Sequence, residues 1–158
     1  MANSTVTMDG EALKKLKEQI MLFGDPTQMD KFLQSCAKEL AARLLRKVIK
    51  RTPVGQYPKG SGKVGGTLRR GWTAEKTQSA TSYVDSLSIT KEGNNYVIEI
   101  INPVEYASYV EFGHRTKNHE GWVEGQFFLT ISEQEIQESA PQILEKKLQK
   151  YLKECFKK

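Results

Sequence analysis

Apolar residues recur every three or four positions over a long stretch in the first half of the chain, and this spacing predicts a helix. The stretch follows residues 25–28 (DPTQ), which supply a capping aspartate, a proline suited to the first turn and a glutamine at the capping-box position. It should end at Thr52, because the following proline disfavours helical geometry in the preceding residue. The predicted helix has about 27 residues and a length of about 40 Å. Its apolar stripe is Met29, Phe32, Leu33, Cys36, Leu40, Leu44, Leu45, Val48 and Ile49.

The same period predicts helices at both ends of the chain. Near the N-terminus, Asp9 can cap a short helix that Gly24 ends, with a stripe of Leu13, Leu16, Ile20 and Phe23. Residues 1–8 are small and polar, and they are interpreted as a flexible arm or a first strand. After residue 127 a second apolar stripe runs to the C-terminus, and Pro141 predicts a break or restart within it. The stripe comprises Phe127, Phe128, Leu129, Ile143, Leu144, Leu148, Tyr151, Leu152 and Cys155.

Period-two alternation predicts strands between these helices. Residues 68–72 (LRRGW) are expected to begin a strand, and Tyr83, Leu87 and Ile89 alternate with polar residues as a half-buried strand requires. After a turn at KEGNN, residues 96–101 (YVIEII) are almost wholly apolar, which predicts a central strand covered on both faces. The two form an antiparallel hairpin of about two by eight residues. The fold class is therefore α+β, a small antiparallel sheet packed by the long helix and the C-terminal helices.

Residues 53–67 (PVGQYPKGSGKVGGT) carry no periodic pattern and are rich in glycine, which predicts a long, irregular and mobile loop. The segment GSGKVGGT resembles a phosphate-binding loop, but it does not fit GxxxxGK[ST] and follows a helix rather than a strand. Nucleotide binding is therefore not supported.

The 158 residues are interpreted as a single domain, 1–158, with enough apolar residues (38%) for a core. The formal net charge is +5, from 24 Lys and Arg against 19 Asp and Glu. Basic residues gather at 43–51 and at 59–70, which suits DNA or an acidic partner, although a solvated basic surface explains them equally well. The candidate contact residues are Arg46, Lys50, Arg51, Lys59, Lys63, Arg69 and Arg70.

Cys36 and Cys155 lie far apart on apolar stripes, so we expect buried free thiols in a reducing cytoplasm rather than a disulfide. The N-terminal residues show no secretory leader pattern, and no run of about 18 apolar residues predicts a membrane span.

His114, His119, Glu111 and Glu120 fall within ten positions, which raises the hypothesis of a metal-dependent hydrolase that uses His114, His119 and Glu111. Their spacing matches no HExxH motif, and no serine lies in a GxSxG elbow. The sequence thus predicts no enzyme, no metal and no cofactor. For Glu111 the structural alternative is an ion pair with Arg115 or with residues 69–70, because an unpaired buried carboxylate is costly.

The order of short motifs resembles the tail-completion, or head–tail joining, family of tailed bacteriophages, whose members also occur in defective prophages and phage-tail-like bacteriocins. Residues 106–115 (YASYVEFGHR) are central to the resemblance, which covers roughly residues 9–155. The family's compact loop with Asp-Thr-Gly is stretched here into residues 54–70, and glycine replaces its proline near residue 125. The matching residues are Thr52, Pro53, Val54, Gly66, Leu68, Arg69, Tyr106, Ala107, Val110, Glu111, Gly113, Arg115, Phe128 and Leu129.

The resemblance implies a non-enzymatic virion protein of the phage neck, which completes the tail and joins it to the head connector as a ring-forming subunit. Its partners would be copies of itself, the tail terminator or tail tube, the head connector and DNA in the lumen, with assembly in the host cytoplasm. The competing hypothesis is a DNA-binding module that uses the basic clusters at 43–51 and 59–70. The predicted subunit or partner interface is Tyr106, Tyr109, Glu111, Phe112, His114, Arg115, Trp122 and Phe127.

Overall fold

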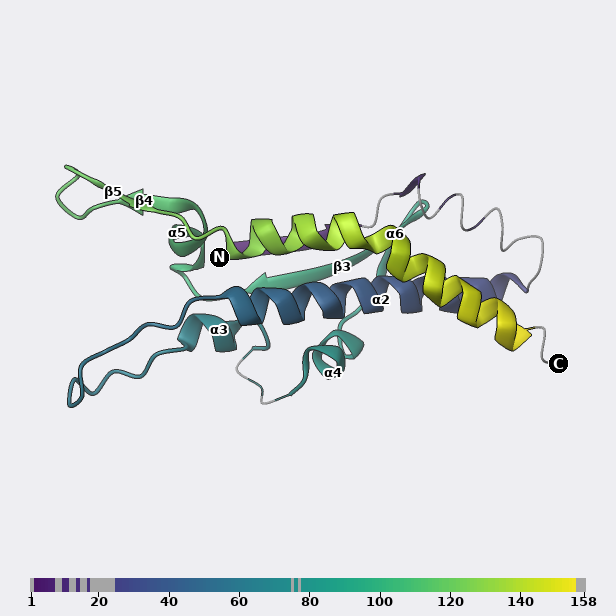
Figure 1. The fold of residues 1–158 in the computed structure, drawn as a ribbon, viewed down its shortest axis with the longest axis horizontal. Coiled ribbons are helices and arrows are strands. Elements are labelled where there is room, and N and C mark those ends of the chain that lie inside the picture. Colours follow the sequence, from purple (N-terminus) through teal and green to yellow (C-terminus); the bar gives the residue numbers. More distant parts are fainter. Residues whose placement is uncertain are drawn as a thin grey trace.

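The computed structural model describes residues 2–7, 10, 11, 14, 17, 25–74, 76 and 78–155. The fold is α+β, as predicted, with long helices packed on a small antiparallel sheet (Figure 1). In chain order the elements are β1 (Ala2–Thr7), α2 (Pro26–Arg51), α3 (Thr67–Gly71), α4 (Ala80–Asp85), β2 (Thr90–Glu92), β3 (Asn95–Asn102), α5 (Ala107–Phe112), β4 (Gly113–Arg115), β5 (Trp122–Glu124) and α6 (Phe128–Cys155).

The long helix α2 is the centre of the core, and its predicted ends are confirmed. The Asp25 side chain accepts a hydrogen bond from the Thr27 amide (3.1 Å), and Thr52 is the C-cap. Its apolar stripe packs against α4, β3 and α6. Each fully buried Leu or Phe in such a stripe contributes about 2 kcal/mol. Cys36 is buried and free, as predicted, and its burial raises the thiol pKa to about 12.

The main sheet has the order β1-β3-β2, with both pairings antiparallel. For residues 1–8 the sequence left an arm or a strand open, and Ala2–Thr7 form the strand. The prediction that the YVIEII strand is central is confirmed, but the prediction that both of its faces are covered is wrong. Tyr96, Ile98 and Ile100 are buried on the core side, whereas Glu99 on the opposite face is exposed. The sheet therefore has one open face, as antiparallel sheets commonly do.

Two of the predicted strands are helical instead. Leu68 and its neighbours form α3, and Tyr83 lies in α4, where the Ser79 side chain accepts a hydrogen bond from the Ser82 amide (3.1 Å). Only Thr90–Glu92 pair as β2, so the hairpin is shorter than predicted. The residues that define the predicted helix at 9–24 (Leu13, Leu16, Ile20 and Phe23) lie outside the described residues; Gly10, Glu11, Lys14 and Lys17 are described and helical.

The C-terminal helix α6 is continuous for 28 residues with Pro141 inside it, so the predicted break or restart is wrong. Figure 1 shows that α6 bends near its middle, as a proline within a helix causes. The first half packs at the core, where the Trp72 and Phe128 rings meet edge to face at 6.1 Å. The second half lies beside the first half of α2, where the Tyr151 ring stacks on the Phe32 ring with 4.5 Å between the ring centres.

Two segments project from the same end of the molecule (Figure 1). One is the irregular loop between α2 and α3, residues 53–66, and the other is the β4–β5 hairpin beside α5. Within the loop Gly60, Gly62 and Gly66 have positive φ, a geometry that glycine adopts without strain.

Candidate functional site

Five exposed aromatic side chains lie on α5, β5 and the residue before α6, and we call them the aromatic end. They belong to Tyr106, Tyr109, Phe112, Trp122 and Phe127, and their exposed fractions lie between 41% and 58%. The segments that carry them adjoin one another at one end of the fold (Figure 1). Sequence reasoning predicted these five as interface residues, and each of them is exposed on a segment at this end of the fold.

The β4–β5 hairpin depends on Gly113, whose φ of 86° suits glycine. A Cβ at this position would lie 2.5 Å from the Val123 carbonyl oxygen, so a larger residue would push the two strands apart. The pairing places His114 opposite Val123 and Arg115 opposite Trp122. The centre of the His114 ring also lies 5.7 Å from that of the Tyr109 ring. His114 and Arg115, which the sequence predicted for the interface, therefore each lie beside an aromatic residue.

Glu111 does not lie on this surface, although the sequence predicted it there. Its side chain is fully buried, and the carboxylate accepts hydrogen bonds from the Leu129 amide (2.9 Å), the Thr130 amide (2.9 Å) and the Thr130 hydroxyl (2.7 Å). These amides belong to the first turn of α6, where an acceptor satisfies free N–H groups and complements the helix dipole. The predicted ion pair with an arginine is therefore replaced by a helix cap.

Thr52 joins the end of α2 to α3. Its hydroxyl donates to the Val48 carbonyl (2.6 Å) and accepts from the indole N–H of Trp72 (2.8 Å). The Arg69 guanidinium donates to the Thr52 carbonyl through Nε (3.1 Å) and Nη2 (2.6 Å). Arg69, predicted to contact DNA or an acidic partner, is thus occupied with holding the end of α2.

Asn102 forms the next junction in the interior. Its amide nitrogen donates to the Leu68 carbonyl (2.8 Å), and its amide oxygen accepts from the Val104 amide (3.2 Å). A Cβ on Gly71 would lie 2.3 Å from the Asn102 oxygen, so only glycine lets α3 approach this closely. Sequence reasoning assigned no role to Asn102; its only signal was a polar residue that ends an apolar strand.

The other predicted basic contacts fall into two groups. Arg51 is held by Glu135 (2.6 Å) and by the Ser132 hydroxyl (2.8 Å), so its charge is already partnered. The remaining candidates carry exposed side chains, with Arg46 and Lys50 on α2, Lys59 and Lys63 in the loop, and Arg70 on α3. The basic cluster at the end of α2 is thereby weaker as a docking patch than its composition suggests.

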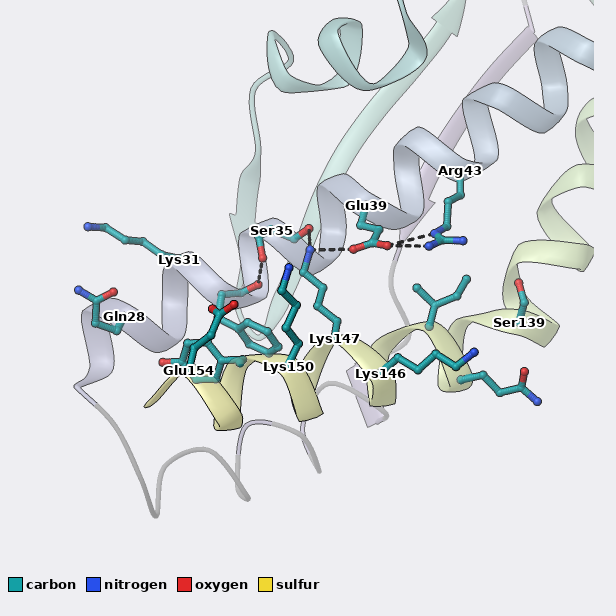
Figure 2. Close-up of a pocket in the computed structure, with 14 residues that line it drawn as sticks. Gln28, Lys31, Ser35, Glu39, Arg43, Ser139, Lys146, Lys147, Lys150 and Glu154 are labelled. Atoms are coloured by element: carbon teal, nitrogen blue, oxygen red, sulfur yellow. Dashed lines mark hydrogen bonds and ion pairs between the residues drawn. The ribbon is translucent and has the colours of Figure 1, made fainter. Parts of the chain in front are cut away.

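A cleft of about 670 Å³ lies between the first half of α2 and the second half of α6 (Figure 2). Lys147 enters it from α6 and donates to the Ser35 carbonyl (3.2 Å) and to Glu39 (2.8 Å), which also accepts from Arg43. Burial disfavours the charged form of Glu39, but the hydrogen bonds from Lys147 and Arg43 outweigh it and lower the pKa. Glu39, a half-buried acid of the cleft, is thus held in ion pairs with Lys147 and Arg43.

Neither a metal site nor a spanning helix is found in the described part of the chain. Within these residues no group of three or more His, Cys, Asp or Glu could hold a metal ion, so Glu111 and the two histidines do not converge. His119 sits in the exposed turn of the β4–β5 hairpin, and Glu111 is buried. Among the same residues no helix is both long and apolar enough to cross a membrane.

Sequence reasoning missed several exposed apolar residues near the aromatic end. Val123 on β5 and Ile131 in the first turn of α6 extend it, and the loop contributes Val54, Tyr57 and Val64. In the sequence these residues stand out only as apolar residues among polar ones. This pattern does not reveal that they are exposed, because exposure depends on the tertiary arrangement.

Comparison with known proteins identifies a family match. The model of the family described as "Bacteriophage HK97-gp10, putative tail-component" matches residues 14–113, that is 100 of 158 residues. The match includes α2, the strands β2 and β3, and α5. No curated protein and no solved structure matches the chain.

Proposed function

Because the chain belongs to the HK97-gp10-like family of bacteriophage tail components, we propose that it forms a ring at the end of the tail. Membership makes it a structural tail component that interacts with other virion proteins. The proposal adds the place and the role: the ring completes the tail and joins it to the head connector. Its further partners are then the tail terminator or tail tube.

The distribution of exposed apolar side chains supports this proposal most strongly. Ten large hydrophobic residues of the described ranges are exposed, and all ten lie in the loop 53–66, on α5 or β5, just before α5 or α6, or in the first turn of α6. These segments gather at one end of the molecule (Figure 1). Soluble monomers rarely expose contiguous apolar patches larger than about a few hundred Å², and buried aromatic side chains are common anchors of protein interfaces.

Among the described residues, the exposed large apolar side chains lie at only one end, which favours a head-to-tail contact. The opposite end carries the α2–α6 cleft, which is lined by five cationic and two acidic side chains and differs chemically from the aromatic end. A contact between two different surfaces of identical subunits is heterologous, and it closes into a ring when its rotation closes. A two-fold dimer would instead need the aromatic end to face itself.

A DNA-binding module receives less support from the structure. Arg51 and Arg69, two of the seven predicted contacts, are engaged inside the protein. Contact between the ring lumen and DNA remains compatible with the exposed lysines, as a secondary property of the assembled ring.

The test is a Tyr109→Ala/Phe112→Ala variant in a phage that encodes this protein. Both side chains are more than half exposed, so the monomer should keep its stability while the contact loses two anchors. We expect at least a tenfold drop in joined particles, with free heads and tails visible by electron microscopy. A matched Gln137→Ala/Glu138→Ala variant on the exposed face of α6 should assemble normally. Normal joining in the aromatic variant would contradict the proposal.

A further inference from the structure

The loop between α2 and α3 carries positive charge for which the described residues provide no ion-pair partner. Residues 53–66 contain Lys59 and Lys63 and no acidic residue. Both lysines are exposed, and Lys63 lies 5.8 Å from the centre of the Tyr57 ring. Val64 next to it has 78% of its surface exposed. The loop thus presents two cations and three exposed apolar side chains to a binding partner.

The open face of the main sheet has the complementary character. An open hollow of about 450 Å³ there, which we call the sheet hollow, is lined by Leu87, Ser88, Thr90, Glu92, Val97 and Glu99. Glu92 and Glu99 are exposed, and no ion pair engages them within the described residues. The neighbouring cation, Lys91, is already paired with Asp30 of α2 at 2.9 Å. Two carboxylates beside the half-buried Leu87 and Val97 match two ammonium groups beside apolar side chains.

We propose that the loop 53–66 of one copy docks in the sheet hollow of the next copy, with Lys59 and Lys63 opposite Glu92 and Glu99. The inference rests on the proposed ring and names the surface that receives each loop. Figure 1 shows the loop leading away from the sheet of its own chain, so a loop that docks in a hollow would come from another copy. The contact is heterologous, because the loop and the sheet hollow are different surfaces.

The charges of the hollow favour this occupant over nucleic acid. Phosphates would be repelled by Glu92 and Glu99, whereas the lysines of a second copy would be attracted. If the loop instead meets DNA in the lumen, duplex DNA should protect Lys59 and Lys63 from chemical modification, and neither lysine should approach the hollow.

A zero-length cross-link tests the contact directly. Copies labelled with ¹⁵N are mixed with unlabelled copies, assembled and treated with a carbodiimide, which joins a lysine amine to a carboxylate only at ion-pair distance. Mass spectrometry should find peptides that join Lys59 or Lys63 of one isotope to Glu92 or Glu99 of the other. If assembled rings give no such cross-linked peptides, or give only peptides whose two parts carry the same isotope, the docking proposal is wrong but the ring proposal is not affected. If the protein is monomeric both in solution and in assembled tails, the proposed function and this contact are both wrong.

Charge reversal supplies the second test. Lys59→Glu/Lys63→Glu and Glu92→Lys/Glu99→Lys should each weaken association at least tenfold, because like charges then face each other. Combining all four changes in one chain restores opposite charges and should return most of the affinity. The control Lys76→Glu/Lys153→Glu makes the same charge change on exposed residues that line neither the sheet hollow nor the α2–α6 cleft, and it should leave association within about twofold. If the fourfold variant does not regain affinity while the control associates normally, the proposed pairing of these lysines with these glutamates is wrong.

Discussion

At the scale of single residues, the motifs that the sequence shares with its family serve mainly as framework. Thr52, Arg69 and Glu111 are all matched residues, and each satisfies backbone groups at the end of a helix. A buried polar group that loses its partner costs about 1–3 kcal/mol. The short motifs therefore hold the junctions between elements, while the exposed aromatics beside them remain available for the proposed ring assembly.

Glu111→Gln should lower the free energy of unfolding by about 2–3 kcal/mol. The substitution keeps the size of the side chain but removes the charge that strengthens three hydrogen bonds to α6, and it turns one acceptor into a donor facing an N–H group. Urea unfolding followed by the fluorescence of the buried Trp72 measures the change. The control Glu105→Gln, at an exposed position, should stay within about 0.5 kcal/mol. A Glu111→Gln protein as stable as the wild type would show that the cap contributes little.

Asp30→Asn should lower stability in a manner that depends on pH. Hydrogen bonds from Tyr96, Lys91 and Gln34 lower the pKa of Asp30 from 3.8 to about 2. A carboxyl whose pKa falls on folding stabilises the protein above about pH 4, and this stabilisation is lost as the pH falls to about 2. The shift corresponds to about 2.4 kcal/mol, which solvent screening reduces to about 1 kcal/mol because the side chain is 34% exposed.

Urea unfolding of wild type and Asp30→Asn at pH 7, 4 and 2 checks this expectation. The difference should be largest at pH 7 and should vanish near pH 2, whereas the exposed Asp85→Asn control should differ little at pH 7. A gap that persists unchanged at pH 2 would mean that the shape of the side chain, and not its charge, stabilises the protein.

At the scale of elements, the length of a periodic signal decided how well the sequence predicted the fold. The α2 stripe repeats over seven turns and carries a cap at each end, so its limits could be placed nearly to the residue. The alternation at Tyr83, Leu87 and Ile89 covered only three apolar positions, which a short helix followed by a half-buried connection produces equally well. The Ser79 cap was the stronger signal there. Proline did not interrupt α6, because a helix held by tertiary packing tolerates a bend.

The candidate site divided in the same way between what local sequence specifies and what it does not. Residues 106–115 could be identified as important from composition, and the five aromatics predicted for the interface are exposed, while their role in an interface stays a prediction. The depth of Glu111 could not be predicted, because its neighbours Tyr109 and Phe112 on α5 are exposed. Only the packing of α5 against the start of α6 distinguishes these positions, and that contact lies 18 residues along the chain.

Removing the loop tip should separate folding from assembly. The two arms of the loop meet at its base, where a Cβ on Gly65 would lie 2.0 Å from the Gly55 carbonyl oxygen. Residues 56–64 can therefore be replaced by a short glycine-containing turn without moving either arm. Because a shorter loop loses less entropy on closure, stability should change by less than about 1 kcal/mol, while self-association should fall at least tenfold.

Thermal unfolding and mass photometry measure the two effects on the same sample. A second variant that keeps the length of residues 56–64 but replaces them with glycine and serine should lose association to the same extent. If that variant assembles normally, the loop acts as a spacer and its lysines and apolar side chains do not form the contact.

At the scale of the whole molecule, the two surfaces of the proposed contact lie on different faces, and this geometry limits what can assemble. The loop projects from the end that carries the aromatics, and the hollow lies on the open face of the sheet. Each copy therefore has one loop to give and one hollow to fill. A copy with an inactivated loop can still bind the loop of another copy in its own hollow. A copy with an inactivated hollow can still insert its own loop into the hollow of another copy.

Two variants, one with an uncharged loop and one with an uncharged hollow, should consequently associate with each other only as pairs. Lys59→Gln/Lys63→Gln removes the charge of the loop, and Glu92→Gln/Glu99→Gln removes that of the hollow, so each protein alone should associate weakly. Mixed in equal amounts, they have one intact pairing available, the native loop of the second protein in the native hollow of the first. Native mass spectrometry should then show heterodimers and no larger species, because both remaining surfaces of the pair are neutral. Larger rings from the mixture would mean that the subunits associate through another surface, whereas two-fold pairing of either variant with itself would contradict a head-to-tail contact.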